Sequence, residues 1–202
     1  MYKRQAYTNT NRHNPIIERD VEEIREGRIN YRFTRKSNYI QPFKKLSKSK
    51  YLKLITDFNF SLLPNSVAVS TDMIREFQQT RYRFVDDGAG EFNKEFFNKQ
   101  FRWNRSYDLN WDFTKNLKFN FNARNEAVID ELKEINPDGS KPGTEAKKQA
   151  IWDNIKDFGR NKNYSHQFGV DYKLPLKSIP FLDWIQVKAQ YNADYSLSLI
   201  HI

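Results

Sequence analysis

The chain has 202 residues and a net charge of +9, and its 38% hydrophobic content lies below the usual share of a packed soluble domain. Aromatic residues nevertheless make up 15% of it, which is typical of strands with one apolar and one wet face. Cysteine is absent, which excludes disulfides and thiol catalysis, and no apolar run reaches the roughly 18 residues of a membrane-spanning helix.

The two ends of the chain read as foreign to the protein. Residues 1–5 and 197–202 match the translation of a transposon mosaic end used in sequencing libraries, in reverse complement and in forward direction respectively. We therefore expect both segments to be adapter-derived and exclude them from fold reasoning. On this interpretation, the lack of a signal peptide in residues 1–30 does not count against an exported protein.

Residues 6–50 are predicted to form an extracellular-side loop with one short helix. Asn14 as N-cap, Pro15 at the first helical position and Gly27 as a stop predict a helix over 14–27. The following polar stretch contains a lysine cluster, which we interpret as a solvated linker rather than a nucleic-acid patch. That cluster consists of Lys44, Lys45, Lys48 and Lys50.

Residues 51–196 alternate between apolar and polar side chains with the period of a β-strand. Six strands are predicted, over 52–62, 67–73, 101–113, 117–123, 164–174 and 185–195, with long loops at 75–99 and 130–163. The second loop should contain a helix from Thr144 to Phe158 that begins at a Thr cap and stops at Gly159.

Short connections after Leu62, Phe113 and Leu174 alternate with long ones after Met73 and Ala127, as in membrane barrels with short periplasmic turns and long outer loops. Six strands are too few to close, since the smallest such barrels have about eight. The predicted fold is therefore all-β with short helices in loops: an antiparallel up-and-down meander that forms an open segment of a large transmembrane β-barrel.

The alternation assigns two faces. The expected lipid-facing residues are Phe58, Phe60, Phe101, Trp103, Tyr107, Leu109, Trp111, Phe113, Phe119, Phe121, Phe168, Val170, Tyr172, Val187 and Tyr191. The expected lumen-facing residues are Asp57, Asn59, Asn104, Asp108, Asn110, Asp112, Asn120, Asn122, Gln167, Asp171, Lys188, Gln190 and Asn192. Arg105 violates the apolar face, and we expect it near one end, where its side chain reaches the membrane interface.

No catalytic residues, cofactor site or metal site are predicted, and we expect that the protein is not an enzyme. His166 lies in a strand face, where a packed ring is favoured over a ligand. Asp86-Asp87-Gly88 and Asp138-Gly139 are interpreted as turns. The acidic and amide side chains of Asp108, Asn110 and Asp112 would suit a metal, but a hydrated lumen wall explains them more simply.

Two other functions stay open. The alternation alone allows a different outer-membrane barrel, such as a nutrient receptor or an assembly factor. A soluble basic β-protein whose aromatic rings stack on single-stranded nucleic acid is a further alternative, although we expect no nucleic-acid partner. A soluble β-sandwich is disfavoured because its buried face is usually built from Val, Ile and Leu.

Several motifs resemble one family. They are Phe58-Asn59-Phe60-Ser61-Leu62-Leu63-Pro64-Asn65-Ser66, Ser70-Thr71-Asp72-Met73, Trp103-Asn104-Arg105-Ser106-Tyr107-Asp108-Leu109, Ile179-Pro180-Phe181-Leu182-Asp183-Trp184 and Tyr191-Asn192-Ala193-Asp194-Tyr195. Together they resemble the SprA/Sov family, the giant outer-membrane translocon of the Bacteroidota type IX secretion system. The resemblance implies a protein-conducting barrel that exports cell-surface proteins and supports gliding motility, with membrane lipid, the rest of the barrel, secreted cargo and secretion-system subunits as partners.

Overall fold

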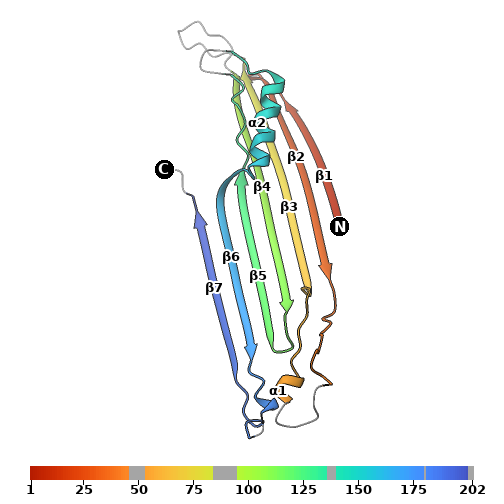
Figure 1. Ribbon diagram of the computed structural model, residues 1–202. Coiled ribbons are helices and arrows are strands. Elements are labelled where there is room, and N and C mark those ends of the chain that lie inside the picture. Colours follow the sequence, from red (N-terminus) through yellow and green to blue (C-terminus); the bar gives the residue numbers. More distant parts are fainter. Residues whose placement is uncertain (46–52, 84–94, 136–139, 180, 200–202) are drawn as a thin grey trace.

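The computed structural model describes the chain except for residues 46–52, 84–94, 136–139, 180 and 200–202 (Figure 1). Within these described residues, seven strands form one antiparallel sheet whose spatial order follows the sequence order, with β1 and β7 as its two open edges. This confirms the predicted all-β meander, with seven strands in place of about six. The strands are β1 (Tyr2–Arg12), β2 (Ile17–Thr34), β3 (Ser66–Tyr82), β4 (Glu95–Asp112), β5 (Leu117–Val128), β6 (Arg160–Lys173) and β7 (Lys188–Ser198).

The connections lie at two ends of the sheet, which we call the upper and lower ends from their places in Figure 1. At the upper end lie the tight turn 13–16, the facing ends of β3 and β4, and the described residues 129–135 and 140–159. At the lower end lie the described parts of the connections 35–65 and 174–187, and the short connection 113–116. The last of these contains η2 (Leu176–Ser178), a single turn of 3-10 helix.

Residues 14–27 do not form the predicted helix. Asn14 lies in the turn between β1 and β2, where its side-chain oxygen accepts hydrogen bonds from the N–H groups of Ile16 and Ile17 at 2.9 and 2.7 Å. The side chain of a helix N-cap accepts backbone hydrogen bonds in the same way, so an Asn at this position is compatible with a turn as well as with the start of a helix. The pairing of β2 with both β1 and β3 stabilises a strand here instead of a helix. Gly27, the predicted helix stop, lies inside β2 opposite Met73. The predicted loop is therefore wrong over 6–34, where β1 and β2 lie, whereas 35–45 do belong to a connection and 46–50 lie outside the described residues.

Residues 53–62 do not form the predicted strand, and residue 52 lies outside the described part of the chain. The segment contains the helical turn α1 (Lys53–Thr56) and a single bridge between Ile40 and Phe60. Asn59 is buried and accepts a hydrogen bond from the N–H of Lys115 at 2.8 Å. The alternation here belongs to a loop that packs against the lower end of the sheet, so the connection before β3 is long, not the short turn that we expected.

The strands extend further toward the upper end than predicted. β3 and β4 occupy much of 75–99, which we expected to be a loop, and β6 begins at Arg160 inside the second predicted loop. β4 has 18 residues, about 59 Å at about 3.3 Å per residue, whereas a tilted strand crosses a bilayer in about 9–11 residues. The sheet is therefore longer than one membrane crossing.

The predicted helix in the second loop is confirmed as α2 (Thr144–Lys156). Its N-cap is Gly143 and makes no side-chain cap bond, so the expected Thr cap is wrong. The chain leaves α2 through Gly159 with φ +71°, and a Cβ there would come within 3.0 Å of Ile129 and of the Val128 carbonyl. Glycine is required at this return point. The predicted turns at 86–88 and 138–139 lie outside the described residues.

Candidate functional site

The strand register separates the aromatic from the polar residues. Residues opposite each other on neighbouring strands share a face. One row across the sheet joins Val67, Leu109, Phe121, Phe168 and Ala193, and the adjacent row joins Ala68, Asp108, Asn122, Gln167 and Asp194. We call these the aromatic face and the polar face.

The predicted residues that lie on strands fall on the expected faces. The aromatic face carries Phe101, Trp103, Tyr107, Leu109, Trp111, Phe119, Phe121, Phe168, Val170, Tyr172 and Tyr191. The polar face carries Asn104, Asp108, Asn110, Asp112, Asn120, Asn122, Gln167, Asp171, Lys188, Gln190 and Asn192. The remaining predicted residues lie in connections at the lower end rather than on strands: Asp57, Phe58, Asn59, Phe60, Phe113 and Val187.

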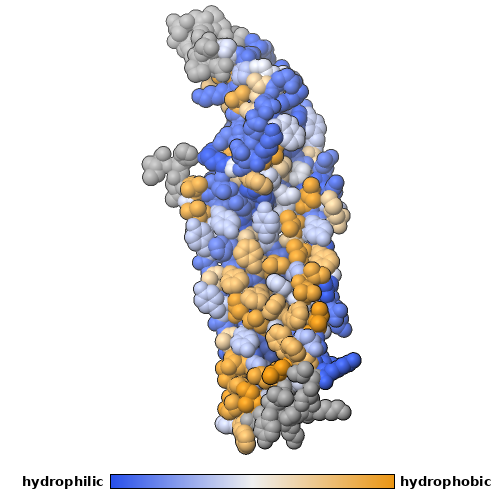
Figure 2. Space-filling view, viewed as in Figure 1, coloured by the Kyte–Doolittle hydropathy of each residue, from blue (hydrophilic) through white to orange (hydrophobic). Residues whose placement is uncertain are grey.

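The rings of the aromatic face pack side by side in one layer. Trp111 lies 6.3 Å from Phe119, and Phe119 lies 6.4 Å from Phe168, measured between ring centroids. The strand residues of this face named above are half-buried or exposed, and none is buried. Figure 2 shows the resulting hydrophobic band below a hydrophilic upper end. Because the rings contact one another within a single layer, no second layer of protein covers their outward side among the described residues.

Sequence reasoning missed part of this face. Tyr31 and Phe33 of β2 lie opposite Val69 and Val67 and extend the aromatic face by one more strand. The alternation of Tyr31 and Phe33 with Arg32 is a strand pattern that the sequence does contain. It was not used because residues 6–50 were interpreted as a loop.

Arg105 lies on the aromatic face but is covered by protein rather than reaching an interface. Its guanidinium lies against two rings that stack on each other, 4.5 Å from the centroid of Trp103 and 5.4 Å from that of Phe158. Its guanidinium donates hydrogen bonds to the Phe158 carbonyl at 3.0 Å and to Asn125 at 3.1 Å. Only 8% of the residue is exposed. The prediction that Arg105 snorkels is therefore wrong.

The segment that covers Arg105 also covers the upper part of the aromatic face, and ion pairs fix it there. Arg75 of β3 forms a two-point ion pair with Glu131 at 2.5 and 2.7 Å. Glu134 accepts hydrogen bonds from Lys99 of β4 and Lys147 of α2. Burial raises the pKa of the Glu134 carboxyl, but the two lysines lower this pKa by more, so it lies below its ordinary value. We call the described residues 129–135 and 140–159 the upper cover.

The polar face is a lattice of amides and carboxylates. Asn104 donates a hydrogen bond to Asp72 at 2.9 Å, Asn110 donates to Ser66 at 3.0 Å, and Asn122 donates to Asp108. Gly169 leaves room for Asn120, whose side-chain oxygen would lie 2.0 Å from a Cβ at that position. These groups can bind water and polar solutes.

Neither a metal centre nor a helical span appears among the residues that the structure describes. No cluster of three or more His, Asp or Glu side chains suited to a metal is present there. In the same described ranges, no helix is long and apolar enough to cross a membrane.

The register and the exposure of the two faces define the chain as an open antiparallel meander with one apolar and one polar face. Comparison of the sequence with protein-family models gave no match, and a search of curated proteins gave none either.

Proposed function

We propose that the chain is a wall segment of a protein-conducting β-barrel in the outer membrane of a Gram-negative bacterium. The aromatic face lies against lipid, and the polar face lines a water-filled lumen. The observation that carries this proposal is the exposure of the aromatic face: its rings form one contiguous layer, yet none of the predicted lipid-facing residues on its strands is buried. Water makes such a surface unfavourable, whereas hydrocarbon does not.

The open edges support a larger assembly. β1 and β7 each leave one row of backbone N–H and C=O groups without a strand partner over the described residues. In lipid such groups must be paired, and closure of the sheet is the general solution. Further strands of the same barrel are therefore the proposed neighbours of both edges.

The motifs quoted above favour a type IX translocon of the SprA/Sov family over a nutrient receptor or an assembly factor. In this proposal the upper end, where the hydrophilic upper cover lies beyond the aromatic band, faces the cell surface. The polar face keeps the lumen wet for secreted proteins that pass to the surface and support gliding motility. It performs no catalysis.

Crosslinking during export tests the function. In cells that carry the whole protein to which this segment belongs, a photo-crosslinker at Asn122 or Gln167 should capture secreted proteins in transit. The same group at Leu109 or Val170 is the matched control on the aromatic face and should capture none. Normal export of surface proteins after deletion of the whole protein would exclude the secretion channel and favour another outer-membrane barrel.

A separate observation would favour the soluble alternative. A nucleic-acid-binding β-protein should dissolve without detergent and bind single-stranded oligonucleotides with an affinity that falls as salt is raised. We expect neither behaviour.

A further inference from the structure

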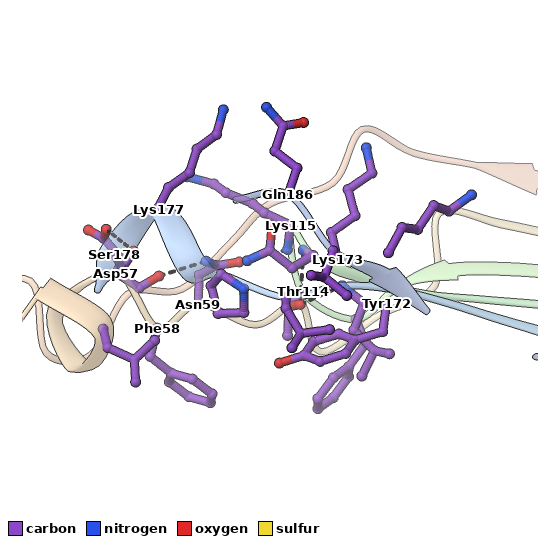
Figure 3. A pocket seen from close by; sticks show the side chains of 18 of the residues that line it. Asp57, Phe58, Asn59, Thr114, Lys115, Tyr172, Lys173, Lys177, Ser178 and Gln186 are labelled. Carbon is purple, nitrogen blue, oxygen red and sulfur yellow. Dashed lines mark hydrogen bonds between the residues drawn. The ribbon is translucent and has the colours of Figure 1, made fainter. Parts of the chain in front are cut away.

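Three lysines gather on the polar face at the lower end of the sheet. Lys173 ends β6 and Lys188 begins β7, and the two are direct partners in the strand register. Lys177 lies in η2, within the connection between these strands. Figure 3 shows its side chain pointing away from that of Tyr172, a residue of the aromatic face, so Lys177 points to the side of the polar face. We call Lys173, Lys177 and Lys188 the lower lysine cluster.

The register places like charges side by side in this cluster. Residues directly opposite each other on neighbouring strands have Cβ atoms about 4.5–5.5 Å apart, and like charges there destabilise a sheet. Lys188 is balanced by an ion pair with Asp171 at 2.9 Å. Lys173 and Lys177 form no ion pair with a carboxylate in the described part of the chain. Two exposed cations are therefore left on the polar face at this end.

A hollow of about 1360 Å³ runs along the cluster, and all three lysines line it. Asp57 also lines this hollow, and it accepts a hydrogen bond from the Ser178 hydroxyl at 3.1 Å. The exposed amide of Gln186 lies in the same wall. Pockets for small molecules have about 300–1,000 Å³. The hollow therefore has room for a segment of a polypeptide beside the lysines.

The cluster differs from the centre of the polar face. A shallow hollow around Gly169 is lined there by amides and by the carboxylates of Asp108 and Asp194, and no Lys or Arg is among its described lining residues. The charge of the two hollows therefore changes sign between the lower end and the centre of the sheet. An anionic segment has its favourable contacts at the lower end.

We propose that the lower lysine cluster binds an acidic segment of a polypeptide at the lower entrance of the lumen, with carboxylates of that segment on the ammonium groups. The proposal rests on the proposed function, which makes the polar face a lumen wall and puts the lower end on the side from which secreted proteins enter. Membrane lipid then lies on the other face of the sheet. A polypeptide carries carboxylates at several positions and can pair with more than one lysine at once, which a small anion does less well.

A local crosslinking assay tests the site. A photo-crosslinker at Gln186 is placed in the whole protein to which this segment belongs, solubilised in detergent. Three labelled peptides of equal length carry Glu, Gln or Lys at the same alternate positions. The Glu peptide should be captured with an apparent affinity about fivefold or more above that of the Gln peptide, since one exposed ion pair contributes up to about fivefold. The Lys peptide should be captured least, and the same crosslinker at Leu109, on the aromatic face, should capture none.

Matched variants assign the preference to the cluster. Lys173→Gln with Lys177→Gln should remove the preference for the Glu peptide, whereas Lys173→Arg with Lys177→Arg should keep it. Lys148→Gln with Lys156→Gln on α2 makes the same change of charge at the upper end and should leave the preference unchanged. Lys173→Gln alone should not lower the free energy of unfolding, because it removes a like-charge pair from the register. A lost preference is then not a loss of fold.

The outcomes distinguish this proposal from the proposed function. Equal capture of the three peptides at Gln186, while Asn122 still captures secreted proteins in cells, overturns the site and leaves the channel standing. A preference for the Glu peptide at Gln186, with no capture at Asn122, supports the site and overturns the channel. Displacement of the Glu peptide by inorganic phosphate at constant ionic strength would assign the cluster to a small anion. Tighter capture of an oligonucleotide of the same charge would assign it to nucleic acid, and either result overturns the proposal.

Discussion

The guanidinium of Arg105 lies 5.4 Å from the ring centroid of Phe158 and donates a 3.0 Å hydrogen bond to the carbonyl of the same residue. These two residues are separated by 53 positions in the sequence. Their contact joins the upper cover to β4 at the level where the uncovered aromatic band begins. A cation that is covered by protein therefore ends the apolar surface.

Truncation of the Phe158 ring should weaken this junction. Phe158→Ala removes the cation–π contact with Arg105 and the stacking on Trp103 at 6.0 Å. We expect a loss of about 1–2 kcal/mol in the free energy of unfolding, measured by urea denaturation of the whole protein to which this segment belongs, in vesicles. Phe181→Ala, at a ring that is 85% exposed, is the matched control and should have little effect. Equal losses for both would show that the contact contributes nothing.

Gly169 and Gly27 provide a matched pair of strand glycines. Gly169→Ala should destabilise the sheet by about 1–3 kcal/mol, because its Cβ would displace the Asn120 side chain. Asn120→Ala in the same chain should recover most of that loss. Gly27→Ala meets no atom within 4 Å and should be neutral or slightly stabilising. A Gly169→Ala variant as stable as Gly27→Ala would contradict the packing of the polar face.

The upper cover should detach in acid. The folded-state pKa of Glu134 lies below its ordinary value, so its ion pairs stabilise the cover fully above the unfolded-state pKa of about 4.3. That stabilisation is lost as the pH falls through the folded-state pKa. Hydrogen exchange of residues 129–135 should therefore accelerate in this acidic range.

The Glu134→Gln variant should show faster exchange at neutral pH and a weaker dependence on pH. Glu145→Gln is the control, because the Glu145 side chain is 88% exposed and pairs only with Lys148 among the described residues. An unchanged pH profile in Glu134→Gln would assign the acid sensitivity to other groups.

The sequence was sufficient for the central strands and α2. Apolar and polar side chains alternate along the whole run from Phe101 to Phe113, which is longer than a typical strand. The tight turn at 113–116 then sets the register of this run against β5. A single residue of slip would move every ring to the polar face, so the pattern determines the register strongly. Both faces of the hairpin could therefore be assigned before the structure was known.

The sequence was misleading where local and long-range interactions compete. The Asn14 signal suits an Asx turn as well as a helix cap, and pairing with β1 and β3 selects the strand. The alternation over 52–62 is a strand pattern, but the segment carries buried polar residues that bond to loops, such as Asn59 with Lys115. The cover over Arg105 depends on a contact between distant segments, which no local pattern encodes.

The most direct test is the accessibility of single cysteines along β4 in the whole protein to which this segment belongs, reconstituted in lipid vesicles. Cysteines at Asp108, Asn110 and Asp112 should react readily with a water-soluble maleimide, whereas cysteines at Tyr107, Leu109 and Trp111 should react slowly and be quenched by spin-labelled lipid when they carry a fluorophore. This alternation over successive residues is the result that the two-faced wall predicts. Uniform reactivity along β4, or protection of the polar positions with reactive aromatic ones, would contradict it.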